Sequence, residues 1–186
     1  MIEHGGNLKK YARLAGCAEA EILDFSINLN PEGPPPGLFQ VCFRALDELG
    51  PYQSPHADRL AELAGEKWGI APEKILFGNG SGELLNLYIR SADVPRAVIV
   101  SPGYLEYAEN CRQARLPVAQ FNLKEENDFR LDLAELHAFL RPHDLVILGN
   151  PDNPTGQTVP AKELYDFIQT HPQHRDIIPV LIHDGV

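Results

Sequence analysis

The 186-residue sequence has little cysteine, little positive charge and no long apolar run. Its three cysteines, Cys17, Cys42 and Cys111, are far apart and odd in number, which argues against a disulfide framework or a Cys-x-x-Cys metal site. No stretch approaches the length of a transmembrane helix, and the first residues lack the basic and apolar pattern of a signal peptide. We therefore expect a cytoplasmic protein with no membrane partner.

Positive charge is scarce, with 16 lysines and arginines against 26 aspartates and glutamates and a net charge of −10. Binding nucleic acid would need a basic surface to neutralise phosphates, so we expect no nucleic-acid partner. A phosphorylated ligand would need positive potential supplied locally, by helix N-termini or a few arginines. Because His171 and His174 have no cysteine near them, we also expect no bound metal.

Apolar residues recur with alternating strand and helix periods along most of the chain. The pattern predicts strands at 24–31, 74–77, 97–100, 118–121, 145–148 and 179–182, and helices at 9–15, 38–49, 56–68, 84–91, 105–114, 133–140 and 161–170. Single helices between successive strands are typical of βαβ units, so we predict an α/β fold with a three-layer, doubly wound, mostly parallel sheet. The sequence stops just after a predicted strand, and we expect a fragment that is incomplete at the C-terminus.

One loop, Asn150-Pro-Asp-Asn-Pro-Thr-Gly156, follows the most apolar short run of the sequence. Each proline fixes its own φ and pushes its predecessor out of the α region, so the loop leaves the predicted strand in one rigid conformation. Open α/β sheets bind their ligands at the carboxyl ends of the strands, which is where this loop would lie. A stiff connection without any ligand would use the same residues, and the heptapeptide alone does not separate these two interpretations.

Two further segments are candidates for ligand binding. The segment Gly78-Asn-Gly-Ser-Gly-Glu83 precedes a predicted helix, and its glycines would let backbone N–H groups approach an anion. An ordinary strand-to-helix turn explains these glycines equally well. The segment Pro102-Gly-Tyr-Leu-Glu-Tyr107 follows the next strand, where Tyr104 could stack on a planar ligand or simply pack at a helix start.

Together these motifs resemble a known family. The order Gly-Asn-Gly-Ser, Pro-x-Tyr-x-x-Tyr, Asn-Pro-x-Asn-Pro-Thr-Gly and a strand ending in Asp is similar to that of the pyridoxal-phosphate enzymes of the aspartate aminotransferase fold, the class I/II aminotransferases. Within this family the segments 4–7 and 24–31 resemble threonine-phosphate decarboxylases of cobalamin biosynthesis, and next histidinol-phosphate aminotransferases. The resemblance implies an N-terminal arm and substrate-side segment at 1–37 and a partial cofactor-binding large domain at 38–186, without the C-terminal small domain.

The resemblance also implies a cofactor, pyridoxal 5'-phosphate, and residues that would hold it. Asn153 would hydrogen-bond the cofactor's phenolic oxygen, Tyr104 would stack on the ring, and Asp184 would pair with the pyridine nitrogen, which keeps the ring an electron sink. Backbone N–H groups of three residues would hold the cofactor phosphate: Gly80, Ser81 and Gly82. Tyr52 would reach the phosphate in the neighbouring subunit of a homodimer with shared sites.

Three N-terminal residues would bind the phosphate or carboxylate of a phosphorylated amino-acid substrate: His4, Asn7 and Asn30. The activity implied is decarboxylation of O-phospho-threonine to aminopropanol phosphate, with a histidinol-phosphate-type aminotransferase as the alternative. A second alternative is a non-catalytic pseudoenzyme or binding module, because the family's Schiff-base lysine lies in a downstream Ser-Lys segment that these 186 residues lack. We therefore expect this chain alone to be inactive. The mid-loop Asp152, often asparagine in relatives, is expected to be a tolerated change.

Overall fold

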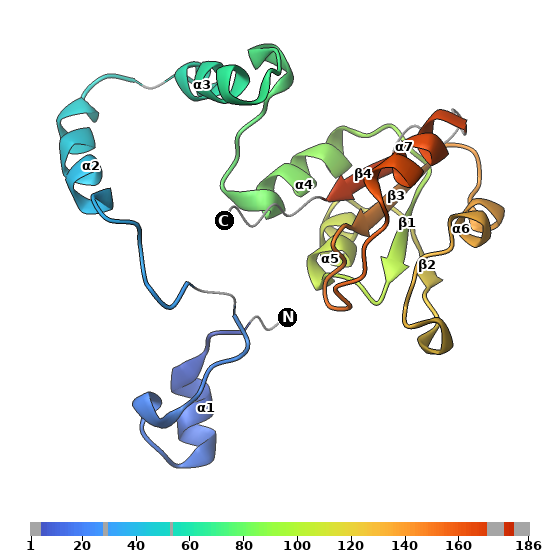
Figure 1. Ribbon diagram of the computed structural model, residues 1–186, viewed down its shortest axis with the longest axis horizontal. Helices are drawn as coiled ribbons and strands as arrows, with labels where there is room; N and C mark the ends of the chain where they lie inside the picture. The colour runs from blue at the N-terminus through green and yellow to red at the C-terminus, as the bar shows by residue number, and fades with distance from the viewer. Residues whose placement is uncertain (1–4, 28–29, 53, 171–176, 181–186) are drawn as a thin grey trace. The chain divides into compact units, whose positions relative to one another are not determined.

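The computed structural model describes residues 5–27, 30–52, 54–170 and 177–180 (Figure 1). The chain forms two compact units, Met1–Pro55 and His56–Val186. The unit boundary falls after Pro55, and the expected domain division at residue 37 stays a prediction. Two predicted site residues, His4 and Asp184, lie outside the described residues.

Short helices make up the described secondary structure of the first unit. Helix α1 (Leu8–Ala15) begins at Asn7, whose side-chain oxygen accepts a hydrogen bond from the Lys10 backbone N–H at 3.2 Å. It ends at Gly16, whose φ of 68° is a left-handed conformation that glycine adopts without steric cost. The other elements of this unit are a 3-10 turn at Glu19–Glu21, helix α2 (Leu38–Ala45) and a second 3-10 turn at Leu46–Glu48. Both predicted helices are thereby confirmed.

The strand predicted at 24–31 is wrong for the described part of that segment. Ser26 folds back on Asp24 instead, since its backbone N–H and its hydroxyl both donate to Asp24 Oδ1, at 2.7 and 2.6 Å. A strand needs a neighbour that completes its backbone hydrogen bonds. No described strand pairs with this segment, so the alternation of apolar and polar residues does not produce one.

The second unit carries the sheet. In chain order its elements are α3 (Asp58–Trp68), a 3-10 turn at Pro72–Lys74, α4 (Gly80–Ser91), β1 (Arg96–Ser101), α5 (Leu105–Gln113), β2 (Val118–Asn122), a 3-10 turn at Glu125–Asn127, α6 (Leu133–Phe139), β3 (Asp144–Gly149), α7 (Ala161–Thr170) and β4 (Ile177–Val180). Every helix and strand predicted between 84 and 170 is confirmed, and β4 begins two residues before the predicted position. The strand predicted at 74–77 is wrong, because Pro72 starts a 3-10 turn and 75–77 pair with no described strand.

Within the described residues, four parallel strands form the sheet, in the order β2-β1-β3-β4. Along β1 and β3 successive side chains point to opposite faces. Val98 and Val146 belong to a core with α6 and α7, whereas Ile99 and Ile147 belong to a core with α4 and α5. Helices therefore cover both faces of the central strands, which confirms the three-layer, doubly wound parallel sheet (Figure 1).

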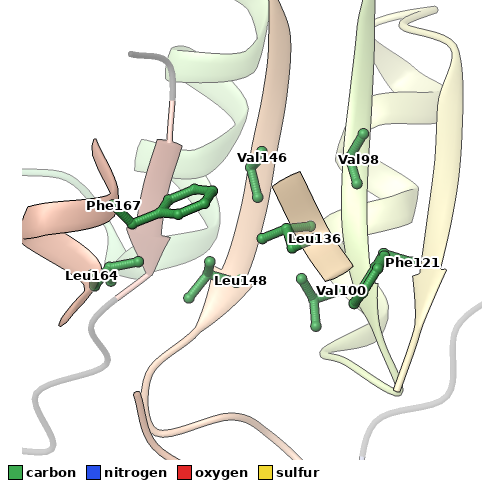
Figure 2. Packing of buried hydrophobic residues seen from close by; sticks show 8 residues of the cluster. All are labelled: Val98, Val100, Phe121, Leu136, Val146, Leu148, Leu164 and Phe167. Atoms are coloured by element: carbon green, nitrogen blue, oxygen red, sulfur yellow. The ribbon is translucent and has the colours of Figure 1, made fainter. Parts of the chain in front are cut away.

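The core on the α6 and α7 face is built from buried aliphatic and phenylalanine side chains (Figure 2). Figure 2 shows Leu136 of α6 among the side chains of β1 and β3, with Leu164 and Phe167 of α7 beside β3. Burial of a leucine or phenylalanine of this kind contributes roughly 1.5–3 kcal/mol relative to exposure. This packing fixes the two central strands, and with them the loops that leave their carboxyl ends.

Candidate functional site

The strand order reverses between β1 and β3. The chain leaves β1 through α5 to reach β2 on one side, and then returns through α6 to β3 on the other side of β1. Such a reversal opens a crevice at the carboxyl ends of the two central strands, where open α/β sheets bind ligands. The loop after β1 leads to Tyr104, and the loop after β3 is the 150–156 heptapeptide, so two predicted motifs flank this crevice.

Asn150 closes the base of the heptapeptide loop. Its side-chain amide donates to the Val159 carbonyl and accepts from the Val159 N–H, both at 2.9 Å. Further along, the Gly156 N–H donates to the Asp152 carbonyl at 2.7 Å. Hydrogen bonds within the loop and to Val159 therefore hold its backbone, which agrees with the rigid conformation predicted from the prolines. Asn153 remains exposed at its tip, and among the described residues none bonds its side-chain amide.

Asp152 lies in the middle of the loop, and the expectation that an aspartate is a tolerated change there stays a prediction. The residue is only 8% exposed. Its Oδ2 accepts a hydrogen bond from the Thr155 hydroxyl at 2.6 Å, whereas its Oδ1 is buried without a hydrogen-bond partner in the described structure. Burying a carboxylate is costly unless it is hydrogen-bonded, so an asparagine and an aspartate are not equivalent here. The sequence motif alone does not indicate that the Asp152 side chain is buried.

Tyr104 precedes α5 in an extended conformation and is half-buried beside the crevice. Burial, together with the nearby Glu106 carboxylate, raises the pKa of Tyr104, which keeps its hydroxyl protonated. Its ring packs edge-on against Tyr107, with ring centroids 5.6 Å apart and planes at 83°. The two tyrosines of the motif therefore pack together, with Tyr104 partly accessible and Tyr107 buried.

The secondary structure of the glycine-rich segment 78–83 differs from the prediction. It was expected to form a loop, but Gly80, Ser81 and Gly82 form the first turn of α4, with φ at 80° for Gly80. The first-turn N–H groups of a helix have no partner within the helix. The N-cap side chain, Asn79, accepts no hydrogen bond from this turn, and the Gly80 N–H donates to the Gly78 carbonyl at 2.8 Å. The N–H groups of Ser81 and Gly82 are therefore the donors that this turn could offer to an anionic ligand.

The first turns of α4 and α5 approach each other closely. A Cβ atom at Gly82 would lie 2.9 Å from Glu106 Oε2, so glycine permits this approach. A second carboxylate, Glu83, accepts a hydrogen bond from the Asn79 N–H at 2.6 Å. Glu106 and Glu83 therefore flank the turn, and a phosphate bound at Ser81 and Gly82 requires the Glu106 carboxylate to turn toward solvent.

These groups fit a planar ligand that carries a phosphate. The open turn of α4 supplies N–H donors, Tyr104 supplies an aromatic face, and Asn153 supplies an unbonded amide, all near the carboxyl ends of β1 and β3. Within the described chain no cluster of three histidine, cysteine, aspartate or glutamate side chains is placed to hold a metal ion. Nor does that part contain a helix long and apolar enough to cross a membrane.

Three of the predicted residues in the first unit are described, and the structure shows only their local roles. Asn7 caps α1. Asn30 holds a turn, because its Oδ1 accepts from the Glu32 N–H at 3.0 Å. Tyr52 is fully exposed. Their predicted roles in substrate and phosphate binding stay predictions, as do those of His4 and Asp184, which lie outside the described residues.

Solved structures with the same fold include the histidinol-phosphate aminotransferase from Clostridium acetobutylicum. The match has a TM-score of 0.70 and 26% sequence identity, and it covers 80% of this chain and 44% of that one. The comparison confirms that the sheet and its helices are those of the large domain of the aminotransferase fold.

Sequence relatives agree with this fold. The chain is 38% identical over 173 residues to the adenosylcobalamin biosynthesis bifunctional protein CobDQ of Leptospira interrogans, covering 91% of this chain and 20% of that protein. It is 31% identical over 165 residues to the threonine-phosphate decarboxylase of Salmonella typhimurium, covering 89% of this chain and 45% of that enzyme. The chain thus spans less than half the length of these curated relatives. The sequence model for aminotransferase class I and II matches residues 20–181, and the chain therefore belongs to this family.

Proposed function

We propose that this chain supplies one wall of a pyridoxal 5'-phosphate site. Enzymes of this family depend on that cofactor. The observation that supports the proposal is that the Tyr104 ring and the Asn153 amide follow β1 and β3, the two strands between which the strand order reverses, while the first turn of α4 lies against Glu106 at the start of α5. A phosphate, a planar ring and a phenolic oxygen are the three features of this cofactor that such groups recognise.

Each group then has a physical task. The N–H groups of Ser81 and Gly82 bind the phosphate at the positive end of α4, aided by Gly80. Tyr104 limits the tilt of the ring, and Asn153 donates to the phenolic oxygen. Asp184 would keep the pyridine nitrogen protonated. When bound, the cofactor supplies an electron sink for charge that develops on the substrate carbon.

The proposed reaction of the whole protein is decarboxylation of O-phospho-threonine to aminopropanol phosphate. Its support is the likeness to the threonine-phosphate decarboxylase of Salmonella typhimurium and to a protein of adenosylcobalamin biosynthesis. His4, Asn7 and Asn30 would then bind the phosphorylated substrate. Tyr52, which is fully exposed, would complete the site of a second copy in a homodimer.

An aminotransferase acting on histidinol phosphate is the second candidate, because a histidinol-phosphate aminotransferase shares the fold at 26% identity. Product analysis separates the two with protein produced from the whole reading frame. Release of CO₂ from O-phospho-threonine supports the decarboxylase. Formation of glutamate that depends on 2-oxoglutarate, without CO₂ release, contradicts it. A reading frame that ends after Val186 without a Ser-Lys segment would favour the non-catalytic alternative.

The cofactor site itself can be tested on the 186-residue chain by titrating pyridoxal 5'-phosphate and following backbone amide signals by NMR. We expect the signals of Gly80, Ser81 and Gly82 to shift, and no borohydride-stable covalent adduct to form. Asn153→Ala and Tyr104→Ala should each weaken binding roughly tenfold, which corresponds to the loss of one good contact.

Two matched control variants remove an asparagine amide or a tyrosine ring at other exposed positions. They are Asn127→Ala in an exposed turn and Tyr165→Ala on the exposed face of α7. They should leave the affinity unchanged. Equal weakening by the site variants and their controls would contradict the proposed site.

A further inference from the structure

Two buried polar atoms remain without a hydrogen-bond partner beneath the crevice. Among the described residues, these atoms are the Tyr107 hydroxyl oxygen and Asp152 Oδ1, both buried and without a hydrogen-bond partner. Tyr107 is 1% exposed and Asp152 is 8% exposed. An unpaired buried polar group destabilises a fold, and nearly all such groups in folded proteins have a hydrogen-bond partner. Two such atoms at one place therefore call for a common explanation.

Both residues lie on the same face of the sheet. Tyr107 packs with Ile99 and Ile147 in the core on the α4 and α5 face. Gly149 follows Ile147 by two residues, so a side chain there would point to that same face. A Cβ at Gly149 would lie 3.1 Å from Asp152 Cα, which places Asp152 against the end of β3 on the Tyr107 side.

Their chemistry is complementary. A tyrosine hydroxyl can donate one hydrogen bond, and a carboxylate oxygen only accepts. Burial, with the Asp152 charge next in importance, raises the pKa of Tyr107 from 10.0 to about 12, so the hydroxyl keeps its proton at neutral pH. The other oxygen of Asp152 is already bonded by the Thr155 hydroxyl, which leaves Oδ1 as the free acceptor.

We propose that Tyr107 and Asp152 are positioning residues, joined by a buried, water-bridged hydrogen bond in which the Tyr107 hydroxyl donates to one water molecule and that water donates to Asp152 Oδ1. This bond links the loop after β1 to the loop after β3. On one side Tyr107 supports the edge-packed ring of Tyr104, and on the other Asp152 precedes Asn153. The pair thereby sets the spacing between the ring-stacking group and the amide donor, a consequence that rests on the proposed function.

The bond can be tested in the chain without any cofactor, by titrating tyrosine labelled with ¹³C at the ring carbon that bears the hydroxyl. We expect Asp152→Asn to lower the pKa of Tyr107 by about one pH unit, because the nearby negative charge is removed. Thr155→Val removes the other contact of the same carboxylate and is the control. It should leave the Tyr107 titration unchanged. An identical Tyr107 titration in wild type and Asp152→Asn would overturn the proposal.

A double-mutant cycle measures the bond itself. Tyr107→Phe combined with Asp152→Ala should change the unfolding equilibrium constant less than the product of the single changes, by roughly fivefold to tenfold. The control cycle, Tyr107→Phe with Thr155→Val, should show no coupling. Equal coupling in the two cycles would contradict the bond. These two measurements need no cofactor. They therefore test the hydrogen bond even if the chain does not bind pyridoxal 5'-phosphate.

The positioning role has its own readout. In Tyr107→Phe the side-chain amide signals of Asn153 and the ring signals of Tyr104 should both shift, whereas Tyr165→Phe on exposed α7 should move neither. A structural role confined to local packing would leave the Asn153 signals in place, and that result would also overturn the proposal.

Discussion

Cys111 is fully buried in α5, in the same core cluster as Tyr107. Burial raises the pKa of its thiol from 9.0 to about 11. The thiolate is the reactive form of cysteine, and about one thiol in a thousand with such a pKa is ionised at pH 8. Cys111 therefore acts as a small apolar residue that packs beneath the site, and Cys42, exposed on α2, provides an internal comparison.

At pH 8 we expect Cys111 to react with a disulfide reagent at least about a hundredfold more slowly than Cys42, since both ionisation and access oppose it. Peptide mass spectrometry at timed intervals measures the two rates separately. In urea the difference should disappear, because unfolding exposes both thiols. Fast labelling of Cys111 in the native chain would contradict the packing of α5.

At the scale of elements, a pair of amides joins α4 to α5. The Asn86 side chain donates to Asn110 Oδ1 at 3.0 Å, and the Asn110 side chain donates to the Glu106 carbonyl at 2.8 Å. Asn110 is buried. This pair fixes the helix that begins with the open turn against the helix that begins after Tyr104, so it helps to set the spacing of two candidate site elements.

Asn110→Ala should lower the free energy of unfolding by roughly 1–3 kcal/mol, because it removes two buried hydrogen bonds and leaves Asn86 without this acceptor. Gln113→Ala, one turn further along α5 at an exposed amide, should change it by less than about 0.5 kcal/mol. Urea denaturation followed by circular dichroism measures both values. Equal free energies of unfolding for the two variants would show that the amide pair does not stabilise the fold.

Sequence patterns located the elements well wherever helices and strands alternate. Between 84 and 170 the periodicity predicted each one, because every strand there has a parallel neighbour and every helix a sheet face to cover. The prediction failed in the described part of 24–31 and at 74–77, where neither segment has a described partner strand. An alternating pattern indicates which side chains a strand would bury. Whether the strand forms depends on a neighbouring strand that pairs with it.

At the scale of the whole molecule, motifs identified candidate residues in the loops after β1 and β3 but not how these residues are supported. Tyr104 and Asn153 were identified because their spacing is that of a family motif. The burial of Asp152 was missed, since it depends on the return of the loop against Gly149. Likewise, Gly80 to Gly82 were placed in a loop, whereas they form the first turn of α4.

Arg96 and Asp144 join the amino ends of β1 and β3, at the opposite end of the sheet from the crevice. The guanidinium binds the carboxylate through two nitrogens, with Nε to Oδ1 at 2.8 Å, and Asp144 is 1% exposed. Burial tends to raise the pKa of Asp144, but hydrogen bonds from Arg96 and from the Arg141 N–H, with the charges of both arginines, outweigh it and lower the pKa below 3.8. The pair thus stabilises the central strands in its charged form.

A group whose pKa is lower in the folded than in the unfolded state stabilises the fold above its unfolded pKa, and this contribution is lost as the pH falls through its folded pKa. Asp144→Asn should therefore lower the free energy of unfolding by about 3 kcal/mol at pH 7, because it leaves the Arg96 charge unpaired. The difference from wild type should shrink as the pH falls below about 4. Asp166→Asn, in the exposed pair with Lys162, should cost less than about 0.5 kcal/mol at any of these pH values. Urea denaturation between pH 2 and 7, in steps of about one pH unit across the titration range of carboxylates, measures all three proteins. A difference between wild type and Asp144→Asn that stays constant with pH would show that the ionised carboxylate does not hold the two strands together.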